Sequence, residues 1–266
     1  YPLSLSVLLC LIEMKCVVIP QTPENHRKLT KHIERCAPAF TIFADGDSLR
    51  IERSPNVQDT PDLLKGFKRN SASGLILYTS GTSGQPKAVV HDFDKLLKKF
   101  ERPTKALRTI NFLLFDHWGG LNTFFHCFTS KCLLIFPSNR QPDYIAELIE
   151  KYSVELLPAT PSFLNMLLIS GAHRKHSLSS LKLITYGAEP MSHTTLARLN
   201  REMPKVELRQ TYGMIEIGVL PVRSKSSDSL WIKIKDQEET VRVRNDILEV
   251  KSSSTLIGYL EEDAPI

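Results

Sequence analysis

Helical and strand-like hydrophobic patterns alternate along most of this 266-residue chain, and the alternation restricts the folds that it can adopt. Apolar residues are spaced for one face of a helix in 93–100 and again in 145–152. The segment 154–157 indicates a short buried strand, and 181–185 and 206–211 indicate further strands between helices. Strands that alternate with helices predict an α/β fold of stacked, largely parallel sheets with flanking helices.

The pattern changes after about residue 222, where apolar and polar residues alternate one by one. Such alternation is typical of half-exposed strands, and it is carried by Leu230, Trp231, Ile232, Lys233, Ile234 and Lys235. We therefore expect an α/β core over residues 1–222 and a β-rich, barrel-like segment over residues 223–266.

The first residues are apolar enough to raise the question of a signal peptide or a membrane segment. Within 3–19, however, Glu13 and Lys15 interrupt the apolar run, and no basic flank precedes it. The uninterrupted part is also too short to cross a bilayer. A helix followed by a buried strand over 16–19 fits better. Because the chain begins at Tyr1 in the middle of this pattern, we expect it to be a fragment of a longer protein.

Charge and cysteine content narrow the classes of function. The chain carries 34 basic and 29 acidic residues, and its net charge of +5 suits an anionic nucleotide but is too scattered to indicate nucleic-acid binding. Lys95, Lys98 and Lys99 are expected on the solvent face of a helix. Five cysteines without CxxC spacing predict neither a zinc site nor a disulfide framework, and they favour a reducing, cytoplasmic location.

The stretch 78–87 carries the strongest chemical signal and reads Tyr-Thr-Ser-Gly-Thr-Ser-Gly-Gln-Pro-Lys. Glycines allow several backbone N–H groups to point at one anion, while the hydroxyls and Lys87 add donors and a positive charge. The Walker phosphate loop requires glycine before its lysine and Ser or Thr after it. Pro86 and Ala88 occupy those places, so a phosphate-loop ATPase or kinase is disfavoured. Apolar runs on both sides predict a polyphosphate-binding loop between two strands.

This stretch resembles the phosphate-binding signature of the adenylate-forming, or AMP-binding, superfamily. That superfamily includes acyl- and aryl-CoA synthetases, luciferases and the adenylation domains of nonribosomal peptide synthetases. The resemblance implies that the loop binds the triphosphate of ATP and that its lysine assists catalysis. The implied ATP-binding residues here are Thr79, Ser80, Gly81, Thr82, Ser83, Gly84 and Lys87.

A second segment, 186–190, reads Tyr-Gly-Ala-Glu-Pro and follows the predicted strand 181–185. Ligands of α/β sheets bind at the carboxyl ends of parallel strands, where this turn would lie. The segment resembles the family's adenine-binding turn. The resemblance implies nucleotide contacts from Gly187, Ala188, Glu189 and Pro190.

A third segment, 210–216, reads Gln-Thr-Tyr-Gly-Met-Ile-Glu and also ends a predicted strand. A tyrosine offers a flat face to a purine, and a carboxylate can bind Mg²⁺. The segment resembles the family's Tyr-Gly-x-Thr-Glu signature, except that Ile215 replaces the threonine whose hydroxyl helps to hold phosphate. The resemblance implies a catalytic, magnesium-binding role for Glu216, with nucleotide contacts from Thr211 and Tyr212 and acid contacts from Gly213 and Met214.

The segment 115–120, Phe-Asp-His-Trp-Gly-Gly, gathers charged, aromatic and glycine residues between two apolar runs. Such clusters are typical of the edge of a site. By its position it resembles the family segment that borders the carboxylate substrate, so His117 and Trp118 are candidates for the acyl pocket. The alternative is that Trp118 belongs to the core and that His117 is a hydrogen-bonded turn residue.

Together the resemblances imply ATP- and Mg²⁺-dependent activation of a small carboxylic acid as acyl-AMP. The acyl group would then pass to a thiol, either coenzyme A or the phosphopantetheine of a carrier protein. The family's ribose-binding aspartate, hinge and C-terminal lid domain with its catalytic lysine do not occur in these 266 residues, so we expect an incomplete core. A non-catalytic, degenerate or truncated nucleotide-binding relative remains the alternative, and Ile215 favours it.

Overall fold

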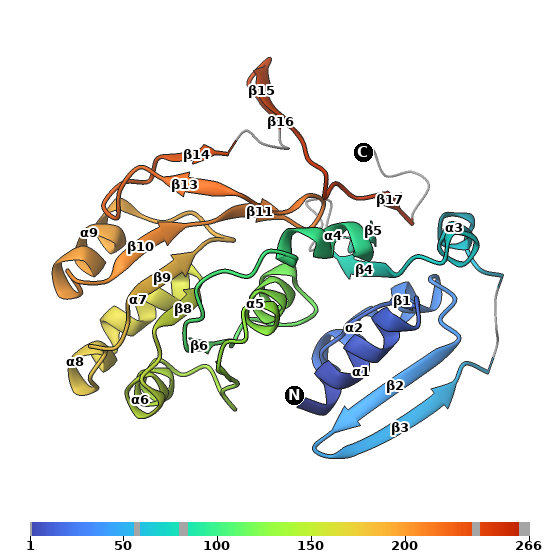
Figure 1. Ribbon diagram of the computed structural model, residues 1–266, viewed down its shortest axis with the longest axis horizontal. Coiled ribbons are helices and arrows are strands. Elements are labelled where there is room, and N and C mark those ends of the chain that lie inside the picture. Colours follow the sequence, from blue (N-terminus) through green and yellow to red (C-terminus); the bar gives the residue numbers. More distant parts are fainter. Residues whose placement is uncertain (1, 56–58, 80–84, 236–239, 261–266) are drawn as a thin grey trace. The chain divides into compact units, whose positions relative to one another are not determined.

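The computed structural model of the chain describes residues 2–55, 59–79, 85–235 and 240–260 (Figure 1). The chain forms two compact units. The first contains Tyr1–Lys98, Phe115–His117 and Ser254–Ile266, and the second contains Lys99–Leu114 and Trp118–Ser253.

The first unit is built on a mixed four-stranded sheet with the order β1-β4-β5-β17. The β1–β4 pair is parallel, whereas the β4–β5 and β5–β17 pairs are antiparallel. The strands are β1 (Val17–Val18), β4 (Gly74–Tyr78), β5 (Ala88–Asp92) and β17 (Gly258–Tyr259). The other elements are α1 (Pro2–Glu13), α2 (Pro23–Glu34), the hairpin of β2 (Phe40–Asp45) and β3 (Ser48–Arg53), α3 (Asp62–Asn70) and α4 (Phe93–Leu97). A 3₁₀ turn at Lys98–Phe100 begins at the last residue of the segment Tyr1–Lys98 and continues into the second unit.

Strand β4 lies at the centre of the first unit because its sequence, Gly-Leu-Ile-Leu-Tyr, is apolar on both faces. Leu75, Ile76 and Leu77 are fully buried, as expected for a strand covered on both sides. Asp92 then ends the neighbouring strand β5, and its carboxylate accepts a hydrogen bond from the Lys95 N–H at 3.0 Å. This N-cap starts helix α4 directly after the sheet.

Five parallel strands form the sheet of the second unit in the order β10-β9-β8-β6-β7. They are β6 (Thr109–Ile110), β7 (Leu134–Ile135), β8 (Leu156–Ala159), β9 (Leu183–Tyr186) and β10 (Glu207–Gln210). The helices are α5 (Trp118–Thr129), α6 (Pro142–Tyr152), α7 (Pro161–Ile169), α8 (Ala172–Lys175) and α9 (His193–Glu202). Apolar side chains of α6, α7, α9, β8 and β9 form one buried cluster. The predicted α/β fold is confirmed.

The chain after the parallel sheet is β-rich, as its alternating pattern predicted. It contains three antiparallel ribbons: β11 (Tyr212–Met214) with β12 (Gly218–Leu220), β13 (Val222–Ser224) with β14 (Ile232–Ile234), and β15 (Thr240–Arg244) with β16 (Ile247–Lys251). Over the described residues the ribbons are separate two-stranded sheets rather than a barrel.

The apolar N-terminal segment forms helix α1 and strand β1, as its interrupted pattern predicted. None of the helices in the described part of the chain combines the length and apolarity that crossing a bilayer requires. All five cysteines carry free thiols.

Candidate active site

The glycine- and hydroxyl-rich stretch joins two antiparallel strands of the first unit. Tyr78 pairs with Ala88, and the Thr79 N–H donates to the Lys87 carbonyl oxygen at 3.0 Å. The stretch is therefore a strand-to-strand loop, as its sequence predicted. The proposed phosphate contacts at Ser80, Gly81, Thr82, Ser83 and Gly84 lie outside the described residues.

The Lys87 side chain lies at the base of this loop and is half-buried. Its ammonium nitrogen is 5.3 Å from the centre of the Tyr259 ring on β17. A cation above a tyrosine face is attracted by the ring's negative charge density. The ring thus attracts the charge of Lys87, the residue for which the sequence predicted a phosphate contact.

The segment before α5 is fixed to the first unit by a buried carboxylate, that of Asp116. Its Oδ2 accepts hydrogen bonds from the Thr22 N–H (3.2 Å), the Thr22 hydroxyl (2.9 Å) and the Asn25 side-chain amide (2.7 Å). The next residue, His117, keeps 52% of its side chain exposed, and its Nε2 is 3.9 Å from Asp116 Oδ1. His117 therefore lies in a turn beside Asp116 with an accessible imidazole, an arrangement compatible with either expectation for this residue.

Trp118 opens helix α5 in the second unit and is only 4% exposed. Its indole Nε1 is buried and has no hydrogen-bond partner among the described residues. Two residues on, Gly120 has no room for a side chain, because a Cβ there would lie 2.1 Å from the Leu114 carbonyl oxygen. The Trp118 ring is therefore packed inside the second unit, and only its small exposed part could contact an acid.

The turns after β9 and β10 meet at the carboxyl edge of the parallel sheet. The Thr211 N–H and hydroxyl both donate to the Tyr186 carbonyl oxygen, at 2.7 and 3.1 Å. A Cβ on Gly187 would lie 2.2 Å from Thr211 Oγ1, so only glycine allows this approach. Ala188 follows with a positive φ of 68°. The two turns that the sequence assigned separately to the nucleotide are thus neighbours in space.

Glu189 and Pro190 complete the first of these turns, and both are exposed. The Glu189 carboxylate accepts hydrogen bonds from the Ser162 hydroxyl and from the Ser162 N–H at 3.0 Å. Ser162 belongs to the first turn of α7, where a carboxylate is favoured by the unpaired N–H groups of the helix. The side chain of Glu189 therefore secures the turn to α7, which leaves its backbone as the part that can contact a nucleotide.

The third segment forms the hairpin of β11 and β12. Tyr212 is half-buried, and Met214 is 50% exposed. Between them, a Cβ on Gly213 would lie 2.3 Å from the Gly218 carbonyl oxygen, so the close strand pair requires glycine. The Ile217 N–H donates to the Met214 carbonyl oxygen (3.3 Å) and closes the turn that contains Ile215 and Glu216.

Glu216 is half-buried in this tight turn. The described residues contain no cluster of three or more His, Cys, Asp or Glu side chains able to hold a metal. Mg²⁺ at phosphate-transfer sites is usually bound by one or two carboxylates together with the substrate's phosphates. A single carboxylate such as Glu216 fits that kind of site and does not fit a metal cage made of protein ligands alone.

Lys99 holds the hairpin to helix α5, a role that the sequence did not reveal. Its ammonium group donates to Asn122 Oδ1 (2.5 Å) and to the Val219 carbonyl oxygen (3.3 Å). The same nitrogen lies 5.3 Å from the centre of the Trp118 ring. Lys99 is exposed, as the sequence predicted, and its tip in addition joins α5 and β12. Burial lowers the pKa of His126, also on α5, and the nearby Lys99 charge lowers it further.

We expect Lys99→Met to loosen the β11–β12 hairpin, because the variant keeps the apolar stem and removes both hydrogen bonds. The free energy of unfolding should fall by about 1 kcal/mol, the usual worth of such bonds at an exposed site. The pKa of His126 should rise, since a repelling charge is lost. Urea denaturation and NMR titration of His126 measure the two effects.

Lys98→Met is the matched control, because Lys98 is an exposed neighbour outside the hairpin contacts. Equal effects of the two substitutions on the hairpin and on His126 would contradict the anchoring role of Lys99.

Comparison with protein families gives a match to the family described as AMP-binding enzyme over residues 4–239. Among curated proteins, 4-coumarate–CoA ligase-like 5 of Oryza sativa subsp. japonica is 27% identical over 221 residues, 75% of this chain and 39% of that protein. Acyl-CoA synthetase 7 of Caenorhabditis elegans is 27% identical over 157 residues, 53% of this chain and 29% of that protein. The chain thus spans less than half the length of these relatives.

Solved structures show the same fold. The luciferase-like enzyme of the mealworm Zophobas morio has a TM-score of 0.56 at 21% identity, covering 77% of this chain and 52% of that one. E. coli MenE with bound OSB-AMS has a TM-score of 0.63 at 15% identity, covering 93% of this chain and 55% of that one. At these identities the likeness concerns the fold alone.

Proposed function

Because the chain belongs to the AMP-binding enzyme family, we propose that it supplies the nucleotide- and acid-binding core of an enzyme that activates a carboxylic acid with ATP. The observation that carries the proposal is the meeting of two glycine turns at one sheet edge, where Thr211 donates to the Tyr186 carbonyl oxygen at 2.7 Å. That edge is where α/β sheets bind nucleotides. CoA ligases among the relatives support acid activation as the reaction.

In the proposed reaction a carboxylate oxygen attacks the α-phosphorus of ATP, a new P–O bond forms, and the bond to pyrophosphate breaks. Negative charge grows on the phosphoryl oxygens, so positive groups aimed at them lower the barrier. Lys87 and the loop before it would supply such groups. Tyr212 would stack on adenine beside Gly187 and Thr211. The attacking atom belongs to the substrate, so no protein nucleophile is needed.

The acid would lie near Gly213 and Met214, with His117 and Trp118 as further candidates. Met214 offers an exposed, deformable apolar surface, and the accessible His117 can donate a hydrogen bond to a carboxylate. These properties suit a small acid with one apolar end.

We expect Glu216→Gln to weaken the Mg²⁺ dependence of ATP binding, because an amide oxygen lacks the negative charge that Mg²⁺ prefers. Isothermal titration of Mg²⁺ into each protein with ATP present measures the effect. Asp228→Gln changes a carboxylate elsewhere in the second unit and serves as the control. Superimposable curves for Glu216→Gln and the unmodified chain would rule out the metal role.

The acyl group would finally pass to a thiol, and the CoA ligases among the relatives favour coenzyme A over a carrier-protein phosphopantetheine. Thioester formation tested with each acceptor distinguishes them. A reducing, cytoplasmic location suits the five free thiols.

A non-catalytic nucleotide-binding relative is the second candidate, and one residue favours it. Ile215, half-buried in the hairpin turn, lacks the hydroxyl that the family signature carries there. Replacing Ile215 with threonine restores that group without adding bulk, so an active enzyme should tolerate the change or gain from it.

Acid-dependent exchange of pyrophosphate into ATP tests the proposal. It should be measured with this chain and with a longer chain of the protein, each against a panel of aryl and aliphatic acids. We expect exchange to rise by orders of magnitude in the longer chain, because catalysis by positioning falls steeply when part of a site is missing. ATP binding without any exchange would favour the non-catalytic candidate, and acid-independent ATP hydrolysis would indicate an ATPase.

A further inference from the structure

The β13–β14 ribbon of the second unit presents an exposed face of four cations and one indole. Strict alternation places Val222, Ser224, Ile232 and Ile234 on the half-buried side and leaves the intervening residues exposed. The exposed set, called the cationic face below, consists of Arg223, Lys225, Trp231, Lys233 and Lys235.

The register of the ribbon holds these side chains together. Arg223 pairs directly with Lys233 across the two strands. Beyond the strand ends the pairing continues, because the Lys225 N–H donates to the Trp231 carbonyl oxygen at 2.9 Å. At the other end the Lys235 N–H donates to the Pro221 carbonyl oxygen at 2.8 Å. Side chains of paired residues point to the same side of a ribbon, so all five share one face.

The opposite side of the ribbon is fixed to the edge strand of the parallel sheet. The Ser224 hydroxyl oxygen accepts a hydrogen bond from the Gln210 N–H of β10 at 2.9 Å, and Ser227 Oγ accepts one from the Leu208 N–H at 3.0 Å. Leu230 packs against the hydrophobic core of the unit. The cationic face therefore points away from the body of the second unit.

Within the described part of the chain this face is only weakly compensated: the Ser226 hydrogen bond lowers the pKa of Asp228, and the charge of Lys225 lowers it further. None of its four cations makes an ion pair with a described carboxylate. Like charges placed directly opposite each other, as in Arg223 and Lys233, destabilise a ribbon. Trp231 is 77% exposed, which is unusual for the side chain with the largest apolar area. The repulsion and the exposed indole lower the stability of the folded chain, and an anionic partner would offset this loss.

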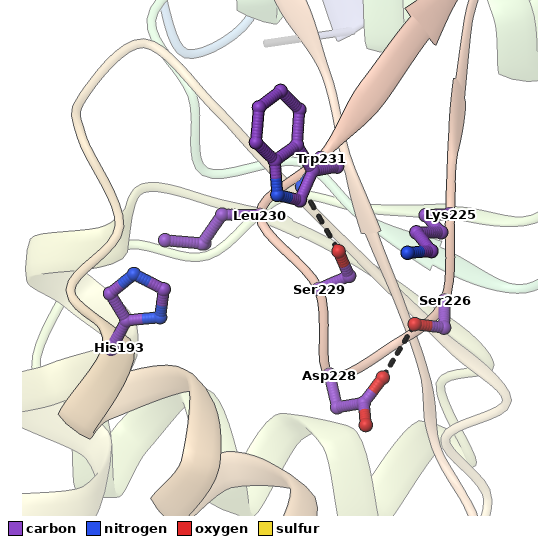
Figure 2. Close-up of a pocket in the computed structure, with 7 residues that line it drawn as sticks. All are labelled: His193, Lys225, Ser226, Asp228, Ser229, Leu230 and Trp231. Carbon is purple, nitrogen blue, oxygen red and sulfur yellow. Dashed lines mark hydrogen bonds between the residues drawn. The ribbon is translucent and has the colours of Figure 1, made fainter.

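A polar pocket of about 310 Å³ adjoins the indole (Figure 2). Lys225, His193 and Ser229 line it together with Trp231. The one carboxylate among the lining residues, Asp228, accepts a hydrogen bond from the Ser226 hydroxyl at 2.5 Å. The pocket is large enough for a phosphate group, and its lining contains one positive charge, on Lys225, and one negative charge, on Asp228.

We propose that the cationic face binds the anionic headgroups of a phospholipid surface, with the Trp231 ring at the level of the headgroups. Lysine and arginine near an anionic leaflet are each attracted to it, and tryptophan prefers the boundary between water and hydrocarbon. Clusters of four to eight such cations beside a membrane-spanning helix or on an amphipathic helix bind anionic lipids, and this ribbon gathers four on one face.

Two other partner classes fit this face less well. Protein interfaces are depleted in lysine, whereas three of the four cations here are lysines. Single-stranded nucleic acids are bound by several aromatic rings in a groove, whereas this face offers one ring on a flat ribbon. Binding to lipid is also independent of ATP, so its test is separate from that of the proposed adenylation.

Tryptophan fluorescence reports directly on the face, because the chain has two tryptophans, and Trp118 is 4% exposed while Trp231 is 77% exposed. We expect sedimentation of the whole chain with vesicles of phosphatidylcholine and phosphatidylserine, together with a blue shift of its emission. Neither should occur with pure phosphatidylcholine. The sedimentation and the blue shift should both disappear at about 1 M salt, because the Debye length is then only ~3 Å.

The double variant Lys233→Gln/Lys235→Gln should partition about 30-fold less onto the anionic vesicles, from the loss of two attracted cations. The matched control Arg140→Gln/Lys205→Gln removes the same charge from exposed positions of the same unit and should partition like the unmodified chain. Trp231→Phe should abolish the blue shift.

Three results would overturn the proposal. One is equal sedimentation with neutral and anionic vesicles, and another is an equal loss in the matched control. The third is tighter, Lys233- and Lys235-dependent binding of an oligothymidylate or a polyglutamate peptide than of vesicles, which would assign the face to nucleic acid or to an acidic protein.

Discussion

Replacing Gly213 with alanine should destabilise the protein and disable the candidate site at the same time. The new Cβ would lie 2.3 Å from the Gly218 carbonyl oxygen and 2.8 Å from the Val219 Cα. Both are backbone atoms of the paired strand, so no side-chain rotation can relieve the clash. Overpacking of this kind costs about 1–3 kcal/mol, and it would push β11 and β12 apart.

Tyr212 and Met214 flank Gly213 on β11, so the same displacement moves the residues assigned to adenine and to the acid. A misplacement of about 1 Å can reduce catalysis roughly 100-fold. We expect a lower melting temperature by calorimetry and weaker binding of a fluorescent AMP analogue. In the longer chain, pyrophosphate exchange should fall by about two orders of magnitude.

Gly66→Ala is the matched control, since a Cβ at this position in helix α3 meets nothing within 4 Å. Alanine inside a helix is favoured over glycine by about 0.5–1 kcal/mol, so this variant should be as stable as the unmodified chain or more so. If Gly213→Ala had the same melting temperature and the same affinity for the AMP analogue as Gly66→Ala, the close approach of β11 and β12 at Gly213 would be contradicted.

Replacing Lys87 with alanine should weaken ATP binding with little loss of stability. Charge-assisted hydrogen bonds contribute about 1.5–3 kcal/mol, so the dissociation constant for ATP should rise by roughly 10- to 100-fold. AMP should be affected less, because the loop is assigned to the triphosphate. The variant also loses the contact between the Lys87 ammonium group and the Tyr259 ring. Such a cation–π contact contributes about 0.5–1 kcal/mol to the free energy of unfolding at exposed sites.

Titration calorimetry with ATP and with AMP measures this difference. Lys98→Ala removes an exposed lysine of the same unit and should leave both affinities unchanged. Lys87→Arg, which keeps the charge, should retain most of the ATP affinity. An unaltered ATP affinity in a folded Lys87→Ala protein would show that the loop does not bind the triphosphate.

The local structure of this chain followed from its sequence because local patterns determine it. The continuous apolar run of β4 predicted a strand buried on both faces, and the alternation around Trp231 predicted a half-exposed one. Pro86 and Ala88 excluded a helix-opening phosphate loop, and the structure has the antiparallel strand pair that the apolar flanks indicated. Each of these inferences depends on neighbouring residues alone.

The candidate site could be predicted only as a set of separate segments. Gly187 was expected to contact the nucleotide and Gly213 the acid. The structure shows that each glycine also makes room for another segment of the chain, Thr211 in one case and Gly218 in the other. Which turns meet depends on the strand order β10-β9-β8-β6-β7, and that order arises from pairing between strands distant in the sequence.

Tertiary structure alone decided the roles of several charged residues. Lys99 looked like one of three lysines on a wet helix face, yet it donates to Val219, 120 residues away. Glu189 belongs to a turn predicted to contact the nucleotide, and only the structure shows that its carboxylate also holds the start of α7. Arg223 and Lys233 carry no signal in sequence until the register of β13 and β14 places them opposite each other. A charge acts over a few ångströms in space, so its partner is set by the packing of distant segments and not by its neighbours along the chain.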